Sequence, residues 1–128
     1  EELNVFHSDV FGLKRLVRLC NELNACHQSQ CYHAVAMICR TIIDYVPPIF
    51  ECDKFSEVAN NYGAGGRSFK KAMQRLNTTS REIANTHLHS QARSADMLPN
   101  HTQVNFTAEL DVLLAEVIRR LESDHPKE

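Results

Sequence analysis

The sequence lacks any apolar run that approaches the roughly 20 residues needed to cross a bilayer. Its first residues, Glu1 and Glu2, lack the basic and apolar regions of a signal peptide. The sequence also lacks an excess of positive or negative charge, because it has 14 Lys and Arg residues and 16 Asp and Glu residues. This balance argues against a generally basic protein that coats nucleic acid, but it permits a local basic patch. We therefore expect a cytoplasmic domain without membrane contact.

The usual spacings of zinc ligands are also missing, because the chain has no Cys-x-x-Cys pair and no His-Glu-x-x-His pattern. The five cysteines are an odd number at irregular spacings, so we predict reduced thiols. We predict no metal and no cofactor. Zinc stays a minor alternative, because scattered ligand types remain: Cys26, His27, Cys31, His33, His87, His89 and His101.

The glycine-rich run over 63–66 precedes a predicted helix, which weakly suggests phosphate binding. It has no P-loop lysine, and no strand precedes it. We interpret it as a turn.

No segment alternates with a period of two, so no strand is predicted. Apolar residues at helical spacing predict a first helix over 8–24, capped by Ser8, and a second from about residue 31 to the prolines at 47 and 48. Further helices are expected over 54–61, from a Ser68 cap to about residue 89, and over 106–121, with an irregular connection over 90–100. The prediction is an all-α helical bundle of four main helices plus one short helix.

The 128 residues suffice for a single helical domain with one core. Because the chain begins with Glu1 rather than Met, we expect it to be a piece of a longer protein. Within the apolar second helix, Arg40 should be paired, since an unpaired buried charge is costly. Asp44, one turn on, or Glu82 could be its partner.

The richest stretch for function is 81–89, which combines Arg81, Asn85, His87 and His89. An arginine can hold a phosphate through its planar fork of donors, and a histidine can transfer protons near neutral pH. On a helical wheel, Arg81, Asn85 and His89 follow one another about 40° apart on a polar flank. His87 instead falls on the apolar stripe, where histidines are usually buried with one hydrogen-bond partner.

The order of helices, together with Arg40 in the second helix and Arg81, Asn85 and His89 in the penultimate one, resembles the HEPN superfamily, and within it the uncharacterised bacterial domains of the DUF4145 type. The similarity covers about 31–121. Two spacings compete: Arg81 with His87 matches the Arg, four to six residues, His pattern of HEPN ribonucleases, whereas Arg81, Asn85 and His89 match the Arg-x-x-x-Asn-x-x-x-His pattern of the DUF4145-like branch. Glu82 departs from the Asn, Asp or His that often follows the arginine in active members.

The resemblance implies two functions. The first is a dimerising or partner-docking module in a nucleic-acid-linked or defence-linked bacterial protein, with another domain of a longer protein as a candidate partner. The alternative is a metal-independent ribonuclease, in which two protomers of a homodimer bring their motifs together on RNA. Its candidate catalytic residues are Arg81, His89, His87 and Asn85.

Overall fold

The computed structural model describes residues 13–93 and 97–124 of the 128-residue chain. Within these ranges the protein is all-α, with five α-helices and no strand, which confirms the predicted fold class. The helices are α1 (Lys14–Gln28), α2 (Tyr32–Tyr45), the short α3 (Phe55–Asn61), α4 (Gly66–Ile83) and α5 (Thr107–Asp124). A 3₁₀ turn, η2 (Pro47–Phe50), follows α2, and a π-helical turn, η3 (Ala84–Leu88), extends α4.

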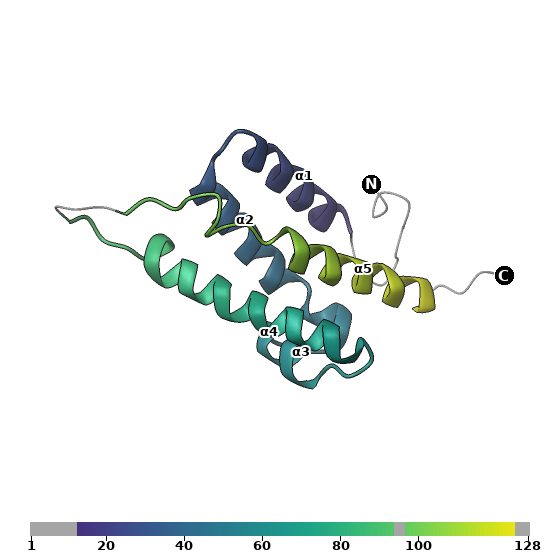
Figure 1. Ribbon diagram of the computed structural model, residues 1–128. Helices are drawn as coiled ribbons and strands as arrows, with labels where there is room; N and C mark the ends of the chain where they lie inside the picture. Colours follow the sequence, from purple (N-terminus) through teal and green to yellow (C-terminus); the bar gives the residue numbers. More distant parts are fainter. Residues whose placement is uncertain (1–12, 94–96, 125–128) are drawn as a thin grey trace.

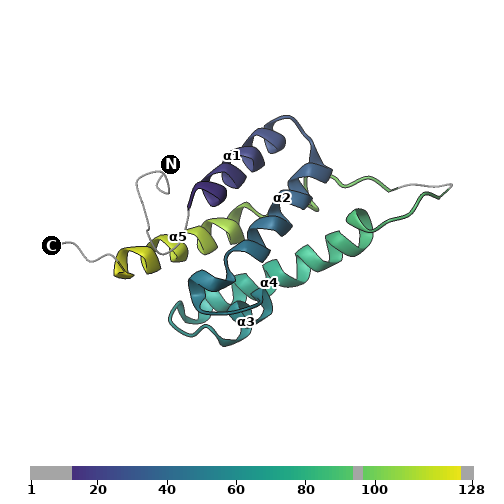
Figure 2. The ribbon, with the colours of Figure 1, turned by 180° about the vertical axis from the view of Figure 1, so that it is seen from behind.

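The helices pack side by side around α2 (Figure 1). The helix α2 contacts α1 along one flank and contacts α4 and η3 along another, while α4 also packs on α3 and α5. Viewed from behind, α3 lies against the first half of α4, and the connection from η3 to α5 leaves the other end of the bundle (Figure 2). The 81–89 stretch therefore lies at the end of the bundle opposite α3.

The first helix extends further than predicted, because α1 ends at Gln28 rather than at residue 24. The half-buried Cys26 packs against the core and so continues the apolar stripe beyond Leu23. A tight turn then stops the helix: Gln30 takes the left-handed conformation, with φ of 60°. The predicted Ser8 cap lies outside the described residues.

The predicted stop after α2 is confirmed, although the two prolines form the first turn of η2 instead of a plain loop. Glu51 ends that turn in the left-handed region, with φ of 59°. The short helix α3 follows as predicted. Its start is held by Glu57, whose Oε1 accepts from the backbone N–H groups of Asp53 at 2.9 Å and Lys54 at 3.0 Å.

The helix α4 begins at Gly66, so the predicted cap at Ser68 is wrong. Gly65 occupies the N-cap position, and an added Cβ there would lie 2.7 Å from the Phe69 ring. Gly66 has φ of +86°, which glycine adopts without strain. The glycine run is thus a close turn that lets Phe69 pack into the core.

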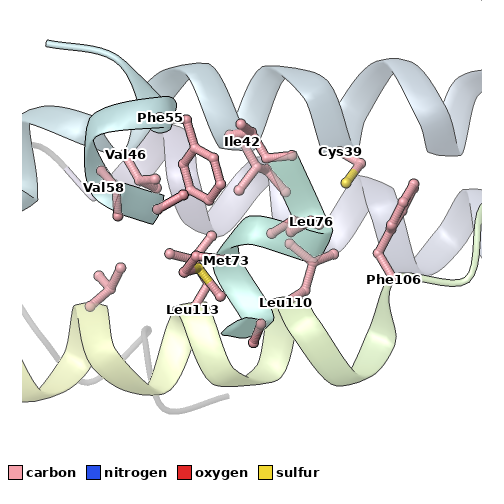
Figure 3. Close-up of a cluster of buried hydrophobic side chains, with 14 of the residues drawn as sticks. Cys39, Ile42, Val46, Phe55, Val58, Met73, Leu76, Phe106, Leu110 and Leu113 are labelled. Carbon is pink, nitrogen blue, oxygen red and sulfur yellow. The ribbon is translucent and has the colours of Figure 1, made fainter. Parts of the chain in front are cut away.

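The core lies where α2, α3, α4 and α5 converge, and its side chains point toward one another (Figure 3). Ile42 from α2, Met73 and Leu76 from α4 and Leu113 from α5 have no solvent exposure. Leu76 and Met73 belong to the predicted apolar stripe of α4, as do Phe69 and Ile83, which are also buried. This packing fixes which face of α4 remains in solvent.

Among the described residues, no helix is both long and apolar enough to serve as a membrane span. Cys39 is a buried thiol, and burial raises its pKa to about 12. Cys39 therefore stays protonated near neutral pH and acts as a small apolar residue of the core.

Candidate functional site

The solvent face of α4 carries an unbroken polar stripe that continues into η3. Its residues alternate at spacings of four and three, and all are exposed: Arg67, Lys71, Gln74, Thr78, Arg81 and Asn85. They lie opposite the buried stripe of Phe69, Met73 and Leu76, because a helix that buries one face presents the other to water. We call this set the α4 stripe.

The helix α4 itself has an excess of positive charge. The helix α4 has five cations, at Arg67, Lys70, Lys71, Arg75 and Arg81, and one carboxylate, at Glu82. This excess stands out in a chain with a formal net charge of −2. The local basic patch that the overall composition permitted is therefore present on one helix.

Most of these cations make no salt bridge within the part of the chain that the structure describes. The exception is Arg75, whose Nε lies 3.7 Å from Oε1 of Glu109 on α5. Arg67, Lys71 and Arg81 are exposed and have no carboxylate partner among the described residues. Their charges are available to an anion without first breaking an ion pair.

The predicted α-helix does not continue to residue 89. It ends at Ile83, and the next turn is the π-helical η3, in which the backbone N–H of His89 donates to the carbonyl of Ala84 at 3.0 Å. This bond spans five residues instead of four, so the α-helical wheel does not apply beyond Ile83. The expected succession of His89 after Asn85 on one α-helical face is therefore wrong. A π-helical turn within a helix is frequently found at a functional site.

Arg81, Asn85 and His89 are nevertheless all exposed. None of them has a side-chain hydrogen bond or salt bridge among the described residues. The structure thus presents a guanidinium, an amide and an imidazole to solvent at the end of the α4 stripe.

His87 is placed differently, with only 6% of its surface exposed. Its Nε2 lies 3.3 Å from Oε1 of Gln103, and the same oxygen accepts from the backbone N–H of Asn100 at 3.2 Å. Because Oε1 accepts, Nε2 of His87 is the donor in this hydrogen bond. Nδ1 is buried and has no partner among the described residues. Neither nitrogen is accessible to a substrate in this arrangement.

Arg40 ties α2 to α4. Its Nε lies 3.5 Å from Asp44, the partner expected one turn on, and its Nη1 donates to Oγ of the buried Ser80 at 3.4 Å. Arg40 thus anchors the helix that carries Arg81, with Asp44 rather than Glu82 as its ion-pair partner.

A polar cluster that the sequence did not reveal holds α5 to α3 and η2. The hydroxyl of Tyr62 donates to Oε2 of Glu116 at 2.5 Å, and Arg119 donates to both oxygens of Glu116 at 2.6 and 2.9 Å. Arg120 donates to the carbonyl of Ile49 at 2.7 Å and lies over the Tyr62 ring. The hydrogen bonds from Arg119 and then from Tyr62 lower the pKa of Glu116. The cluster lies at the other end of the bundle from His89 and is structural.

No metal site is formed by the residues that the structure describes, since no three His, Cys, Asp or Glu side chains converge there. The zinc alternative therefore has no geometric support in this part of the chain. Some histidines do lie near one another in pairs: the rings of His33 and His87 are 6.2 Å apart, and those of His27 and His101 are 5.3 Å apart.

The α4 stripe was detectable in the sequence, but it extends beyond the 81–89 stretch on which the predicted site was based. Arg67, Lys71 and Gln74 repeat at the same spacing as Arg81 and Asn85, so one helix face continues from the motif toward the glycine turn. The residues Arg81 and Asn85 of the predicted motif are therefore the last part of the longer α4 stripe.

Comparison with known proteins identifies no relative of this chain. No protein-family model matches it, and the searches of curated proteins and of solved structures each returned no match. The HEPN resemblance therefore rests on the helix order, Arg40 and the residues of the 81–89 stretch.

Proposed function

We propose that this domain is an RNA-binding, HEPN-like helical module that contacts the RNA backbone through the α4 stripe. The observation that carries the proposal is the exposure of Arg67, Lys71 and Arg81 along one helix face without carboxylate partners among the described residues. Phosphates attract such cations and release bound counterions, which drives association.

The length of the α4 stripe suits an extended ligand. Arg67 and Arg81 are 14 residues apart, which corresponds to about 21 Å along a helix. The arginines can each hold a phosphate through two donors, and Gln74, Thr78 and Asn85 add neutral polar groups between them. A backbone-tracking contact of this kind favours RNA of many sequences.

The experiment is a binding titration of a fluorescent single-stranded RNA, followed by anisotropy over a series of salt concentrations. The variant Lys71→Gln/Arg81→Gln should bind more weakly, and its salt dependence should be less steep by about 1.4, because each lost phosphate contact removes about 0.7 from the slope on a single strand. The matched control is Lys14→Gln/Arg15→Gln, which removes two exposed cations from α1. Equal binding by the double variant and the starting protein would exclude the α4 stripe as the RNA surface.

The second candidate function is metal-independent RNA cleavage, favoured by the exposed Arg81, Asn85 and His89 at the end of the same stripe. In this reaction the 2′-hydroxyl loses its proton to a base and attacks the adjacent phosphorus. The bond to the 5′-oxygen breaks, and that oxygen takes a proton, which leaves a 2′,3′-cyclic phosphate and a 5′-hydroxyl. Arg81 would stabilise the charge that develops on the phosphate oxygens, and Asn85 would position the phosphate.

Cleavage needs both a base and an acid. His87 is buried, so His89 is the exposed imidazole of the 81–89 stretch. A second copy of the chain would supply the second imidazole, so the proposed enzyme is a homodimer with two 81–89 segments facing one cleft. Glu82 also stands where the active members of the family that the chain resembles often have Asn, Asp or His after the arginine. For this reason binding without cleavage is the first proposal.

Cleavage is tested on a panel of labelled RNAs in EDTA, with Arg81→Ala, His89→Ala and His87→Ala proteins whose folding is checked by circular dichroism. An enzyme should lose about 10²-fold or more of its rate in His89→Ala, the usual scale of general acid–base help. His87→Ala should change stability more than rate. Absence of cleavage in the starting protein, together with RNA binding that depends on Lys71 and Arg81, would leave the binding module and remove the enzyme.

A context in a defence-linked bacterial protein, with another domain as partner, belongs to the same proposal and rests on the family resemblance.

A further inference from the structure

Two free cysteines flank the turn that joins α1 to α2 (Figure 1). Cys26 lies in the last turn of α1, and Cys31 stands directly before α2. The backbone N–H of Cys31 donates to the carbonyl of Cys26 at 2.8 Å. Inside that bond, the N–H of Gln30 donates to the carbonyl of His27 at 3.2 Å, and Gln30 is left-handed, with φ of 60°. Two such bonds around a left-handed residue form a Schellman motif, in which the side chains of the first and last residues frequently touch.

The outer hydrogen bond also limits how far apart the two cysteines are. Its length of 2.8 Å, with the covalent bonds that lead from N and O to each Cα, keeps the two Cα atoms within about 6.7 Å of each other. Disulfides usually join residues whose Cα atoms are about 4.4–6.8 Å apart. The backbone of the folded turn therefore holds Cys26 and Cys31 within reach of a disulfide.

The two thiols differ in their access to solvent. Cys31 is exposed, and its Sγ donates to the carbonyl of Ser29 at 3.7 Å, so this thiol lies against the turn. Cys26 is half-buried and packs against the core. A reagent from solvent thus reaches Cys31 first, whereas Cys26 is placed to react with a group already attached to Cys31.

We infer that Cys26 and Cys31 form a redox-active dithiol, a modification site whose substrates are small-molecule disulfides. The product is an intramolecular disulfide that links the end of α1 to the residue before α2. In a reducing compartment, disulfides of this kind are transient and serve in catalysis or redox sensing. Cys39, by contrast, is buried in the core, where such a reagent does not reach it.

The reaction has two exchange steps. The thiolate of Cys31 attacks one sulfur of the small disulfide, the S–S bond breaks, and a small thiolate leaves and takes a proton from solvent. The thiolate of Cys26 then attacks the Cys31 sulfur in this mixed disulfide, and the second small thiolate leaves in the same way. The protein gives up two electrons and two protons, and the small disulfide is reduced to two thiols.

The test equilibrates the full chain with mixtures of reduced and oxidised glutathione and stops the exchange with acid. Free thiols are alkylated, and the oxidised pair is then reduced and labelled with a second reagent. Trypsin releases residues 19–40 as one peptide, because this stretch has no Lys or Arg before Arg40, and tandem mass spectrometry locates the two labels in it. We expect the first disulfide to join Cys26 and Cys31. Its oxidised-to-reduced ratio should be about tenfold or more above that of the same chain in concentrated urea, because the folded turn preorganises the two thiols.

Cys26→Ser should instead retain one glutathione on Cys31, because the thiol that displaces it is missing. The matched control is Cys52→Ser, which removes another half-buried thiol and should leave the disulfide between Cys26 and Cys31 unchanged. The inference is overturned if the first disulfide joins a different pair or two chains, or if Cys26→Ser gives the same product as the starting protein. It is also overturned if the folded chain forms the disulfide no more readily than the chain in urea.

Discussion

Replacing Glu116 by Gln tests the polar cluster that fastens α5 to the rest of the bundle. In the structure, Glu116 accepts from the Tyr62 hydroxyl at 2.5 Å, and both residues are buried. A hydrogen bond to a charged group contributes about 1.5–3 kcal/mol net. The hydrogen bonds from Arg119 contribute in the same direction, although water weakens them because that side chain is half exposed. We therefore expect Glu116→Gln to lower the free energy of unfolding by about 1.5–3 kcal/mol at pH 7.

The pH dependence of this loss provides the sharper test. The pKa of Glu116 is lowered in the folded protein, first by the hydrogen bonds from Arg119. The folded protein then binds fewer protons than the unfolded chain around pH 4, so the charged group stabilises the fold above the unfolded pKa of about 4.3. That contribution disappears as the pH falls through the lower, folded pKa. The difference between the starting protein and Glu116→Gln should therefore shrink in acid.

The assay is urea unfolding followed by circular dichroism at pH 7, 5, 4 and 3. Glu122→Gln is the matched control, since Glu122 is an exposed carboxylate on the same helix. A stability difference for Glu116→Gln that stays constant from pH 7 to pH 3, or one no larger than that of Glu122→Gln, would refute the reasoning.

Two further changes probe the turn before α4 and the core. Gly65→Ala should destabilise the protein by about 1–3 kcal/mol, because the new Cβ would lie 2.7 Å from the Phe69 ring, whereas Gly63→Ala meets nothing within 4 Å and should be close to neutral. Thermal unfolding of the two variants checks this, and equal melting temperatures would contradict it. At pH 8 the exposed Cys31 should react with iodoacetamide in the native protein, whereas Cys39, whose pKa burial raises to about 12, should react only after unfolding. Mass spectrometry of the labelled peptides reads out both sites, and rapid native labelling of Cys39 would contradict its burial.

The sequence predicted the helices well because their apolar residues recur at helical spacing. Phe69, Met73 and Leu76 mark the buried face of α4 in the sequence and are buried in the structure. The prolines at 47 and 48 marked the end of α2, because proline cannot continue a helix. The exact helix ends were less predictable. Ser68 is a good cap by type, but the packing of Phe69 against Gly65 moved the start of α4 to Gly66.

The candidate site was predictable in part. Helical geometry placed His87 on the buried stripe and Arg81 and Asn85 on the solvent face, and the structure has them there. Helical geometry could not predict the π-helical η3. A five-residue segment is too short for its apolar spacing to distinguish a π-helical turn from an α-helical one. Nor could it predict the bond between Tyr62 and Glu116, which are 54 residues apart. Contacts of that kind depend on how the helices pack rather than on any local pattern.

The central claim is that the α4 stripe contacts RNA, and the most direct measurement is NMR mapping of a single-stranded RNA titrated into the full chain. The account predicts that the largest side-chain and amide shifts fall on Arg67, Lys71, Arg81 and Asn85, and that they diminish as salt is raised. Shifts of equal size on the exposed face of α1, or no shifts on α4 at RNA concentrations that saturate binding, would contradict it.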